Sequence, residues 1–251
     1  MTKKSINRLE IIPISGKLRI EFIPKKQNFN LEIQKEIDEH WQESKNCFNG
    51  PLIDVIQFKN SNDEIYFLTQ KGSYKAFIGT KNRRPSSIKD VTNGKYCMPL
   101  SVGTMVISSD DKIAVTKRTG TYLNNDRYSF PAEGYLDLNC VKNNEISIFD
   151  GIAMEMKEEL GINELKLFRI LGIVYDSLIT KQPYIATIWE TNLNSSQIKE
   201  CFRNTEKKEF ESIEFIENKK DPFTDFINKH ELTLHNIGKA MLYASYQGWK
   251  I

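Results

Sequence analysis

The chain has 251 residues, of which 39% are hydrophobic and 27% are charged, and its formal net charge is +2. This balance is ordinary for a globular protein that can bury a sizeable core, and it excludes partners that are recognised through bulk charge. We therefore expect neither a nucleic acid nor a membrane surface as the principal partner.

No stretch approaches the ~18 apolar residues that a membrane-spanning helix needs. The cationic start of the chain also lacks an apolar run of signal-peptide length, so we expect a cytoplasmic protein. The four cysteines are widely spread and show no metal-ligand spacing with one another or with histidine. Reduced thiols are expected, and a zinc site is not.

The first part of the chain is predicted to combine short strands with one helix. Strands are expected at residues 8–14, 17–23, 52–58 and 65–70, and the first two, which flank a Ser-Gly turn, are expected to form a hairpin. Apolar residues at helical spacing predict a helix over residues 30–46, namely Leu31, Ile33, Ile37 and Trp41. Residues 81–95 are polar and rich in turn formers. We place a domain boundary there, between an extension at 1–95 and a larger domain at 96–251.

The larger part is predicted to be α/β with short strands. Strand or strand-loop segments are expected at 100–108, 112–118, 128–138, 168–176, 182–192 and 210–217, and helices at 148–160, 195–204 and 232–248.

The helix at 148–160 carries the most informative pattern. Ser147 followed by Asp150 predicts its start, and Gly161 predicts its end. At 100° per residue, Glu155, Glu158 and Glu159 share an arc beside the apolar face. Such carboxylates repel one another, and grouped hard oxygens suit Mg²⁺ or Mn²⁺. A solvated, glutamate-rich helix end is the alternative.

The string MEMKEELGI, residues 154–162, resembles the second half of the Nudix box, and FPAEGYLD, residues 130–137, resembles the strand and loop that lead into the box. The resemblance covers about residues 98–247 and implies a Nudix-type α/β/α sandwich with a mixed sheet, here with a small α+β extension before it. It also implies that Gly134 is the loop glycine and that Glu155, Glu158 and Glu159 bind the metal, with Glu158 and Glu159 also catalytic. The implied activity is Mg²⁺-dependent or Mn²⁺-dependent hydrolysis of a nucleoside diphosphate linked to another group.

Three departures from the box bear on activity. Met154 stands where the family has arginine, and the segment from Gly134 to Glu155 is six residues longer than in the family. The middle glutamate of the box would fall at Ile146, with Glu145 one position away. These departures leave the glutamate helix intact and bear on the efficiency of turnover.

Basic residues near the loop are candidates for binding the substrate phosphates, and each could equally be a solvated surface charge: Arg118, Lys117, Arg127, Arg83 and Arg84. The resemblance implies a general base outside the box, for which the segment 206–217 offers Glu206, Glu209, Glu211 and Glu214. We favour Glu209. Charged residues on an exposed edge strand are the alternative explanation.

The segment HWQESKNCFNGPLIDV, residues 40–55, followed by YKAFIGT, resembles the leading region of a Nudix subgroup that acts on UDP-sugars. Nucleotide-sugars are therefore the favoured substrate class, with ADP-ribose or dinucleotides as the alternative within enzymes. Trp41 is expected in the core rather than against a base. A catalytically impaired nucleotide-binding or sensor module is the second hypothesis, and the sequence leaves oligomerisation open.

Overall fold

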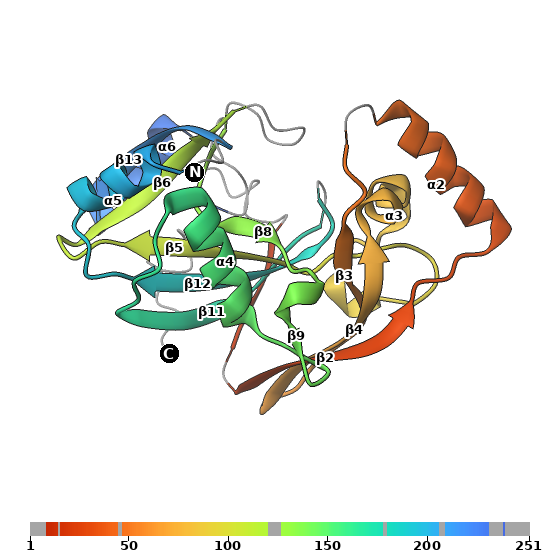
Figure 1. The fold of residues 1–251 in the computed structure, drawn as a ribbon. Coiled ribbons are helices and arrows are strands. Elements are labelled where there is room, and N and C mark those ends of the chain that lie inside the picture. The colour runs from red at the N-terminus through yellow and green to blue at the C-terminus, as the bar shows by residue number, and fades with distance from the viewer. Residues whose placement is uncertain are drawn as a thin grey trace.

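The computed structural model describes residues 9–14, 16–44, 47–119, 127–177, 180–205, 209–230 and 238, and these form two mixed β-sheets with helices packed on them (Figure 1). The eight-stranded sheet has the order β1 (Leu9–Pro13), β11 (Leu167–Asp176), β12 (Pro183–Glu190), β5 (Ser101–Ile107), β6 (Lys112–Arg118) and β13 (Phe210–Glu217), with β7 (Tyr128–Ser129) on β6 and β8 (Glu133–Tyr135) on β5. Strands β5 and β12 run parallel, and the other pairs are antiparallel.

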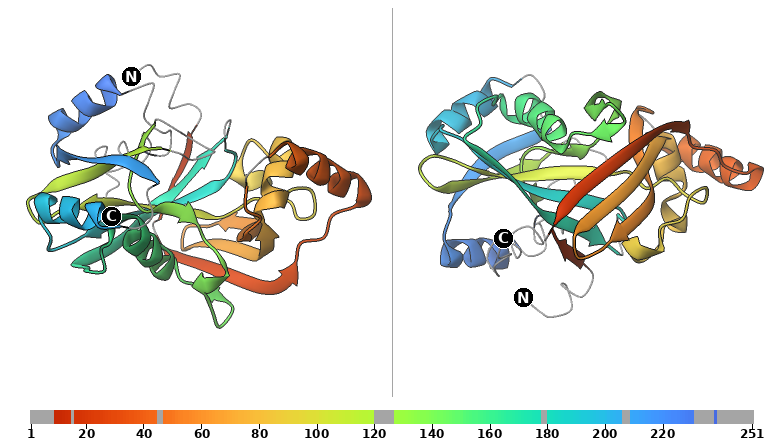
Figure 2. Two further views of the ribbon diagram at one scale, coloured as in Figure 1. Left: turned by 45° about the horizontal axis from the view of Figure 1, so that its top comes forward. Right: turned by 90° about the horizontal axis from the view of Figure 1, so that it is seen from below.

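Both faces of this sheet are buried. Successive side chains of a strand point to opposite faces, and the central strands carry apolar residues on both. Val102 and Val106 of β5 join the core under α4 (Ile148–Leu160) and α5 (Ser195–Arg203). Met105, between them, joins the second core, to which α6 (Lys220–Lys229) contributes Phe223 and Ile227. Figure 2 shows α4 and α6 on opposite sides of the sheet. The expected α/β/α sandwich with a mixed sheet is therefore confirmed.

The five-stranded sheet belongs mostly to the N-terminal part of the chain. Its order is β3 (Pro51–Asn60), β4 (Glu64–Ser73), β2 (Lys17–Lys26), β10 (Glu145–Ile146) and β9 (Val141–Lys142), and two helices accompany it, α2 (Leu31–Glu43) and α3 (Tyr74–Gly79). Short 3₁₀ segments lie at Lys81–Arg83, Ile88–Asp90 and Leu138–Cys140.

Each part of the chain contributes a strand to the sheet that is formed mostly by the other part. Strand β1, from the N-terminal part, pairs with β11 of the large sheet, and β10, from the later part, pairs with β2 of the small sheet. The predicted hairpin of residues 8–14 and 17–23 is therefore wrong, because β2 instead runs parallel to β4. A division of the chain at residue 95 stays a prediction.

The six additional residues between Gly134 and Glu155 lie in a segment that contains the β9–β10 hairpin. Asn143 and Asn144 at its tip both have positive φ, 52° and 62°, as a two-residue type I′ turn requires. The Asn144 carbonyl accepts a hydrogen bond from the Phe22 N–H at 2.8 Å. The added length therefore attaches the loop to the small sheet.

The helices at 31–43, 148–160 and 195–203 confirm the prediction, whereas α6 was not predicted. The expected helix at 232–248 lies outside the described residues, apart from residue 238. Leu31 is 90% exposed, so its predicted place on the apolar stripe is wrong; Ile33 and Ile37 are buried, and Trp41 is partly buried.

All four cysteines are free. Among the described residues, no helix has the length and apolar character needed to cross a membrane.

Candidate active site

Helix α4 is fixed at both ends by the residues that the sequence singled out. The Ser147 side chain accepts a hydrogen bond from the Asp150 N–H at 3.1 Å, and Gly161 ends the helix in the left-handed conformation, with φ of 69°. These caps set where the glutamates of the helix point relative to the sheet.

The loop glycine and the first glutamate of the helix are in direct contact. Gly134 lies in β8, opposite Val102 of β5. A β-carbon on Gly134 would lie 1.9 Å from Glu155 Oε1 and 2.5 Å from Glu155 Cδ. Only glycine therefore lets the Glu155 carboxylate approach the main chain here.

Glu159 is buried, with 3% of its surface exposed, and holds the turn that precedes β8. Its Oε2 accepts hydrogen bonds from the N–H groups of Ala132 at 2.7 Å and Glu133 at 3.3 Å. Ala132 has a positive φ of 56°, which is uncommon for a residue with a side chain. Burial, together with the negative charge of Glu155, raises the pKa of Glu159 well above its usual value. The solvated-helix alternative therefore does not apply to Glu159.

Arg118, at the end of β6, lies among acidic side chains. Its Nη2 is 3.8 Å from Glu133 Oε2 and its Nη1 is 3.6 Å from Glu209 Oε2. The guanidinium also lies over the Phe210 ring, 5.1 Å from its centroid. Burial disfavours the charged arginine, but the charges of Glu133, Glu159 and Glu209 outweigh it, so the pKa of Arg118 is raised. Arg118 thus holds Glu133 and Glu209 together.

Glu133 was not singled out by the sequence, although it directly precedes Gly134. Burial raises its pKa to about 7, against the opposing effect of Arg118. The buried Tyr184 hydroxyl lies beside this carboxylate, and its hydrogen bond to Glu133 also opposes the rise in the pKa of Glu133. A β-carbon on Gly103 would lie 1.5 Å from that hydroxyl and 3.0 Å from Glu133 Cγ. Glycine at 103 therefore makes room for both groups.

The chemistry of this acidic group fits a hard divalent cation. Glu133, Glu155, Glu159 and Glu209 supply carboxylate oxygens around the single positive charge of Arg118, and such oxygens are the ligands that Mg²⁺ and Mn²⁺ prefer. Within the described part of the chain, no three acidic, histidine or cysteine side chains already converge as a metal site. A cation would have to complete its coordination by drawing these side chains together.

The other predicted residues lie in different surroundings. Glu158 is exposed. Glu211 pairs with Lys117 at 3.0 Å and not with Arg118, because a register shift between Phe210 and Ser212 interrupts the pairing of β13 with β6. This shift explains why the apolar residues of the strand do not alternate regularly.

The three other candidate arginines differ from one another in their contacts. Arg83 pairs with Glu32 and Glu36 of α2 and, in the described part of the chain, with no residue of the acidic group. Arg84 is buried, lies over the Phe77 ring and donates to the carbonyl oxygens of Phe77 and Thr180. No hydrogen bond or ion pair among the described residues joins it to the acidic group. Arg127 is partly buried beside β6, where its carbonyl accepts a hydrogen bond from the Arg118 N–H at 2.9 Å.

The positions that depart from the Nudix box are occupied by core or surface residues. Met154 is partly buried and packs against the large core, and Ile146 is itself part of that core. Glu145 is exposed on β10, where it pairs with Glu21 of β2. The hairpin thus directs Glu145 toward the small sheet.

No protein-family model and no curated protein sequence matches this chain. Similar solved structures include DR0079 from Deinococcus radiodurans, at 12% sequence identity and a TM-score of 0.47, with 76% of this chain and 96% of that chain covered. A MutT protein from Methanosarcina mazei Go1 has 13% identity and a TM-score of 0.40, with 61% and 96% covered. A Nudix hydrolase from Nitrosomonas europaea has 11% identity and a TM-score of 0.38, with 60% and 90% covered.

These proteins are similar to the chain only at the level of the stated TM-scores and identities, which assign neither a substrate nor turnover to it.

Proposed function

We propose that this protein is a Nudix hydrolase that uses Mg²⁺ or Mn²⁺ to cleave the pyrophosphate bond of a nucleoside diphosphate derivative. The observation that carries the proposal is the contact between the glutamate helix and the loop before it. Glu155 lies against Gly134, and Glu159 accepts hydrogen bonds from the turn at residues 132–133. A solvated helix end would make neither contact.

In this proposal Glu155 and Glu159 hold the cation, and the exposed Glu158 completes its coordination. A bound divalent cation neutralises pyrophosphate oxygens and activates a water molecule. Glu209, whose side chain is 42% exposed beside Arg118, is our candidate for the general base because it is both accessible and near the acidic group. Arg127 is the candidate for binding the substrate phosphates, since no described residue pairs with its guanidinium.

Nucleotide-sugars are the favoured substrate class, by the resemblance of residues 40–55 to the subgroup that acts on UDP-sugars. The test is a screen of UDP-sugars, ADP-ribose and dinucleotides with Mg²⁺ or Mn²⁺. Released phosphate is read after treatment of the products with a phosphatase. Turnover of UDP-sugars above the other two classes supports the assignment, and turnover of ADP-ribose or dinucleotides alone contradicts it.

A nucleotide-binding module with impaired turnover is the second candidate. The observation that favours it is Met154, which packs against the core where the family's arginine would place a charge beside the glutamates. Calorimetric titration of the same compounds separates the two candidates. Saturable binding without phosphate release would favour the binding module.

A further inference from the structure

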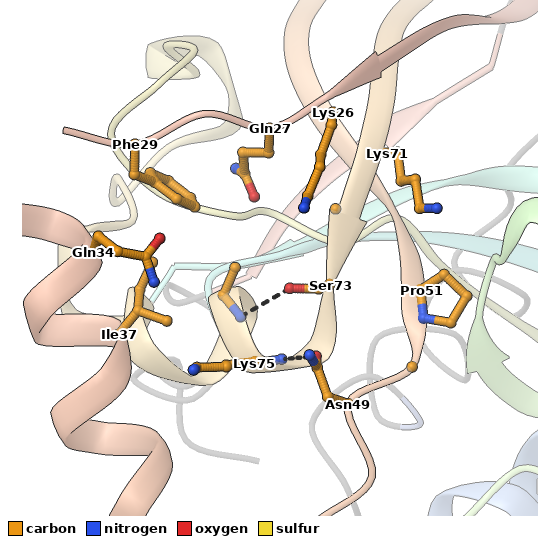
Figure 3. A pocket seen from close by; sticks show the side chains of 13 residues that line it. Lys26, Gln27, Phe29, Gln34, Ile37, Asn49, Pro51, Lys71, Ser73 and Lys75 are labelled. Atoms are coloured by element: carbon orange, nitrogen blue, oxygen red, sulfur yellow. Dashed lines mark hydrogen bonds between the residues drawn. The ribbon is translucent and has the colours of Figure 1, made fainter. Parts of the chain in front are cut away.

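A second candidate site lies in the N-terminal part of the chain, among elements that the proposed hydrolase site does not use. A pocket of about 480 Å³ opens between α2, the end of β2 and the junction of β4 with α3 (Figure 3). This volume is in the range of small-molecule sites, which is about 300–1,000 Å³. The pocket is lined by three lysines and by no acidic residue: Lys26, Lys71 and Lys75.

Lys26 and Lys71 lie directly opposite each other on the neighbouring strands β2 and β4. Like charges on neighbouring positions of two paired strands repel each other. Both side chains are exposed, and no ion pair joins either ammonium group to a carboxylate among the described residues. Lys75 differs, because its Nζ lies 2.6 Å from Asp38 Oδ1. Two uncompensated ammonium groups in one concave site favour an anionic ligand, and phosphate is the anion for which lysine is commonly used.

Amide side chains supply hydrogen-bonding groups beside the lysines. Gln27 Nε2 donates to the Tyr96 carbonyl at 2.8 Å, which fixes the orientation of the amide. Gln27 Oε1 is buried and has no hydrogen-bond partner in the described part of the chain, and Figure 3 shows the Gln27 side chain at the wall of the pocket. Asn49 Oδ1 accepts from the Lys75 N–H at 2.8 Å, which leaves the two N–H donors of Asn49 Nδ2 for a ligand.

The remaining wall is apolar. Phe29, Ile37 and Pro51 face the same space as the lysines (Figure 3). A bare anion gains nothing from an aromatic ring and an aliphatic wall, whereas a nucleoside presents a flat apolar body with polar edges. The lining therefore fits a ligand that carries both a phosphate and a nucleobase.

We propose that this pocket binds a nucleotide, with its phosphate on Lys26 and Lys71 and its base near Phe29. The proposal does not rest on the hydrolase assignment, because none of the residues that line the pocket belongs to the proposed hydrolase site. Strand β2, which carries Lys26, also pairs with β10 in the segment that leads to α4. A nucleotide in this pocket would thus contact the same strand as the lengthened loop.

The test is calorimetric titration of the full chain with AMP, UMP or inorganic phosphate, in EDTA so that metal-dependent turnover does not contribute. Wild type, Lys26→Gln/Lys71→Gln and the matched control Lys25→Gln are compared. Lys25 is exposed and adjacent to Lys26, and it does not line the pocket. Thermal melts verify that the variants are folded.

We expect at least one nucleotide to bind wild type and Glu159→Gln alike, with an affinity that falls about tenfold or more in the double variant and stays within about twofold in Lys25→Gln. Inorganic phosphate should bind more weakly than the nucleotide. The proposal is overturned by the absence of binding, by equal effects of the pocket and control substitutions, or by equal affinity for phosphate and nucleotide. Loss of binding in Glu159→Gln alone would move the nucleotide to the α4 site and also overturn it.

Discussion

The Glu155 carboxylate lies against the main chain of Gly134, so close that a β-carbon at that position would stand 1.9 Å from Glu155 Oε1. The two residues come from different elements, α4 and β8, and lie 21 positions apart in the sequence. Their contact, together with the hydrogen bonds from residues 132 and 133 to Glu159, fixes the glutamate face of α4 against the loop.

Gly134→Ala should displace Glu155 while the protein stays folded. The colliding atom is the end of a flexible side chain, so we expect the free energy of unfolding to change by only about 1 kcal/mol. Misplacing a proposed metal ligand should lower kcat about 10- to 100-fold and raise the Mg²⁺ concentration needed for half-maximal rate. Steady-state kinetics over a Mg²⁺ series measures both quantities. Wild-type values for the two would show that the contact has no role in the reaction.

Glu159→Gln should separate the charge of Glu159 from its structural role. The glutamine Oε1 can still accept the Ala132 N–H, so the turn persists, and removing a buried carboxylate should leave the protein as stable or more stable near pH 7. Loss of the charge should lower turnover about 10²-fold or more. Glu200→Gln, at an exposed position on α5, is the control and should match wild type. Equal rates for both variants would leave Glu159 as a structural residue only.

Glu209→Gln should lower kcat by about 10²- to 10⁴-fold if Glu209 is the general base, with metal affinity nearly unchanged. Glu211→Gln is the matched control on the same strand, since Glu211 pairs with Lys117. Rates across a pH series are the measurement, and the acidic limb should flatten in the Glu209 variant alone. Should the Glu211 variant be the impaired one, the assignment of the base would shift by two residues. If neither variant is impaired, the general base would instead be Glu133 or one of the glutamates of α4.

Asp54 gives a pH dependence that is independent of the proposed active site. It is fully buried in β3, and burial raises its pKa to about 7, although hydrogen bonds from Gln70 Nε2 and the Met98 N–H oppose the shift. Because the folded pKa exceeds the unfolded value of 3.8, its contribution to stability is fully present below pH ~4 and is lost as pH rises through ~7.

Asp54→Asn should remove this loss. We compare the free energy of unfolding of the variant with that of wild type at each pH. The variant's advantage should grow by roughly a few kcal/mol from pH 5 to pH 8, since each unit of pKa shift corresponds to ~1.4 kcal/mol. Urea denaturation at several pH values measures it, and the contributions of other carboxylates cancel in the difference. A difference that is constant with pH would show that Asp54 ionises freely in the folded protein.

Local signals were enough to predict the glutamate helix. Its start at Ser147 and its end at Gly161 depend on residues within one turn of the helix, so the sequence contains all the required information. The α/β character followed in the same way from alternation in the strands and spacing in the helices, whereas the sandwich arrangement was expected only from the resemblance to the Nudix box.

Pairing between distant segments was not predictable from local signals. Strands β1 and β2 are each correct as strands, but their partners, β11 and β4, lie far along the chain, and a nearby Ser-Gly turn favoured the hairpin instead. Glu133 was missed for the same reason. Its importance comes from Arg118 and Tyr184, which reach it only in the folded sheet.

Metal dependence of hydrolysis tests the central claim most directly. Wild type should release phosphate from a nucleoside diphosphate derivative with Mg²⁺ or Mn²⁺, lose this activity in EDTA and regain it when the cation is restored, whereas Glu159→Gln should stay at least about 10²-fold slower under all three conditions. Full turnover in EDTA, or restoration of Glu159→Gln to the wild-type rate by the cation, would contradict the assignment of a metal-dependent site to α4.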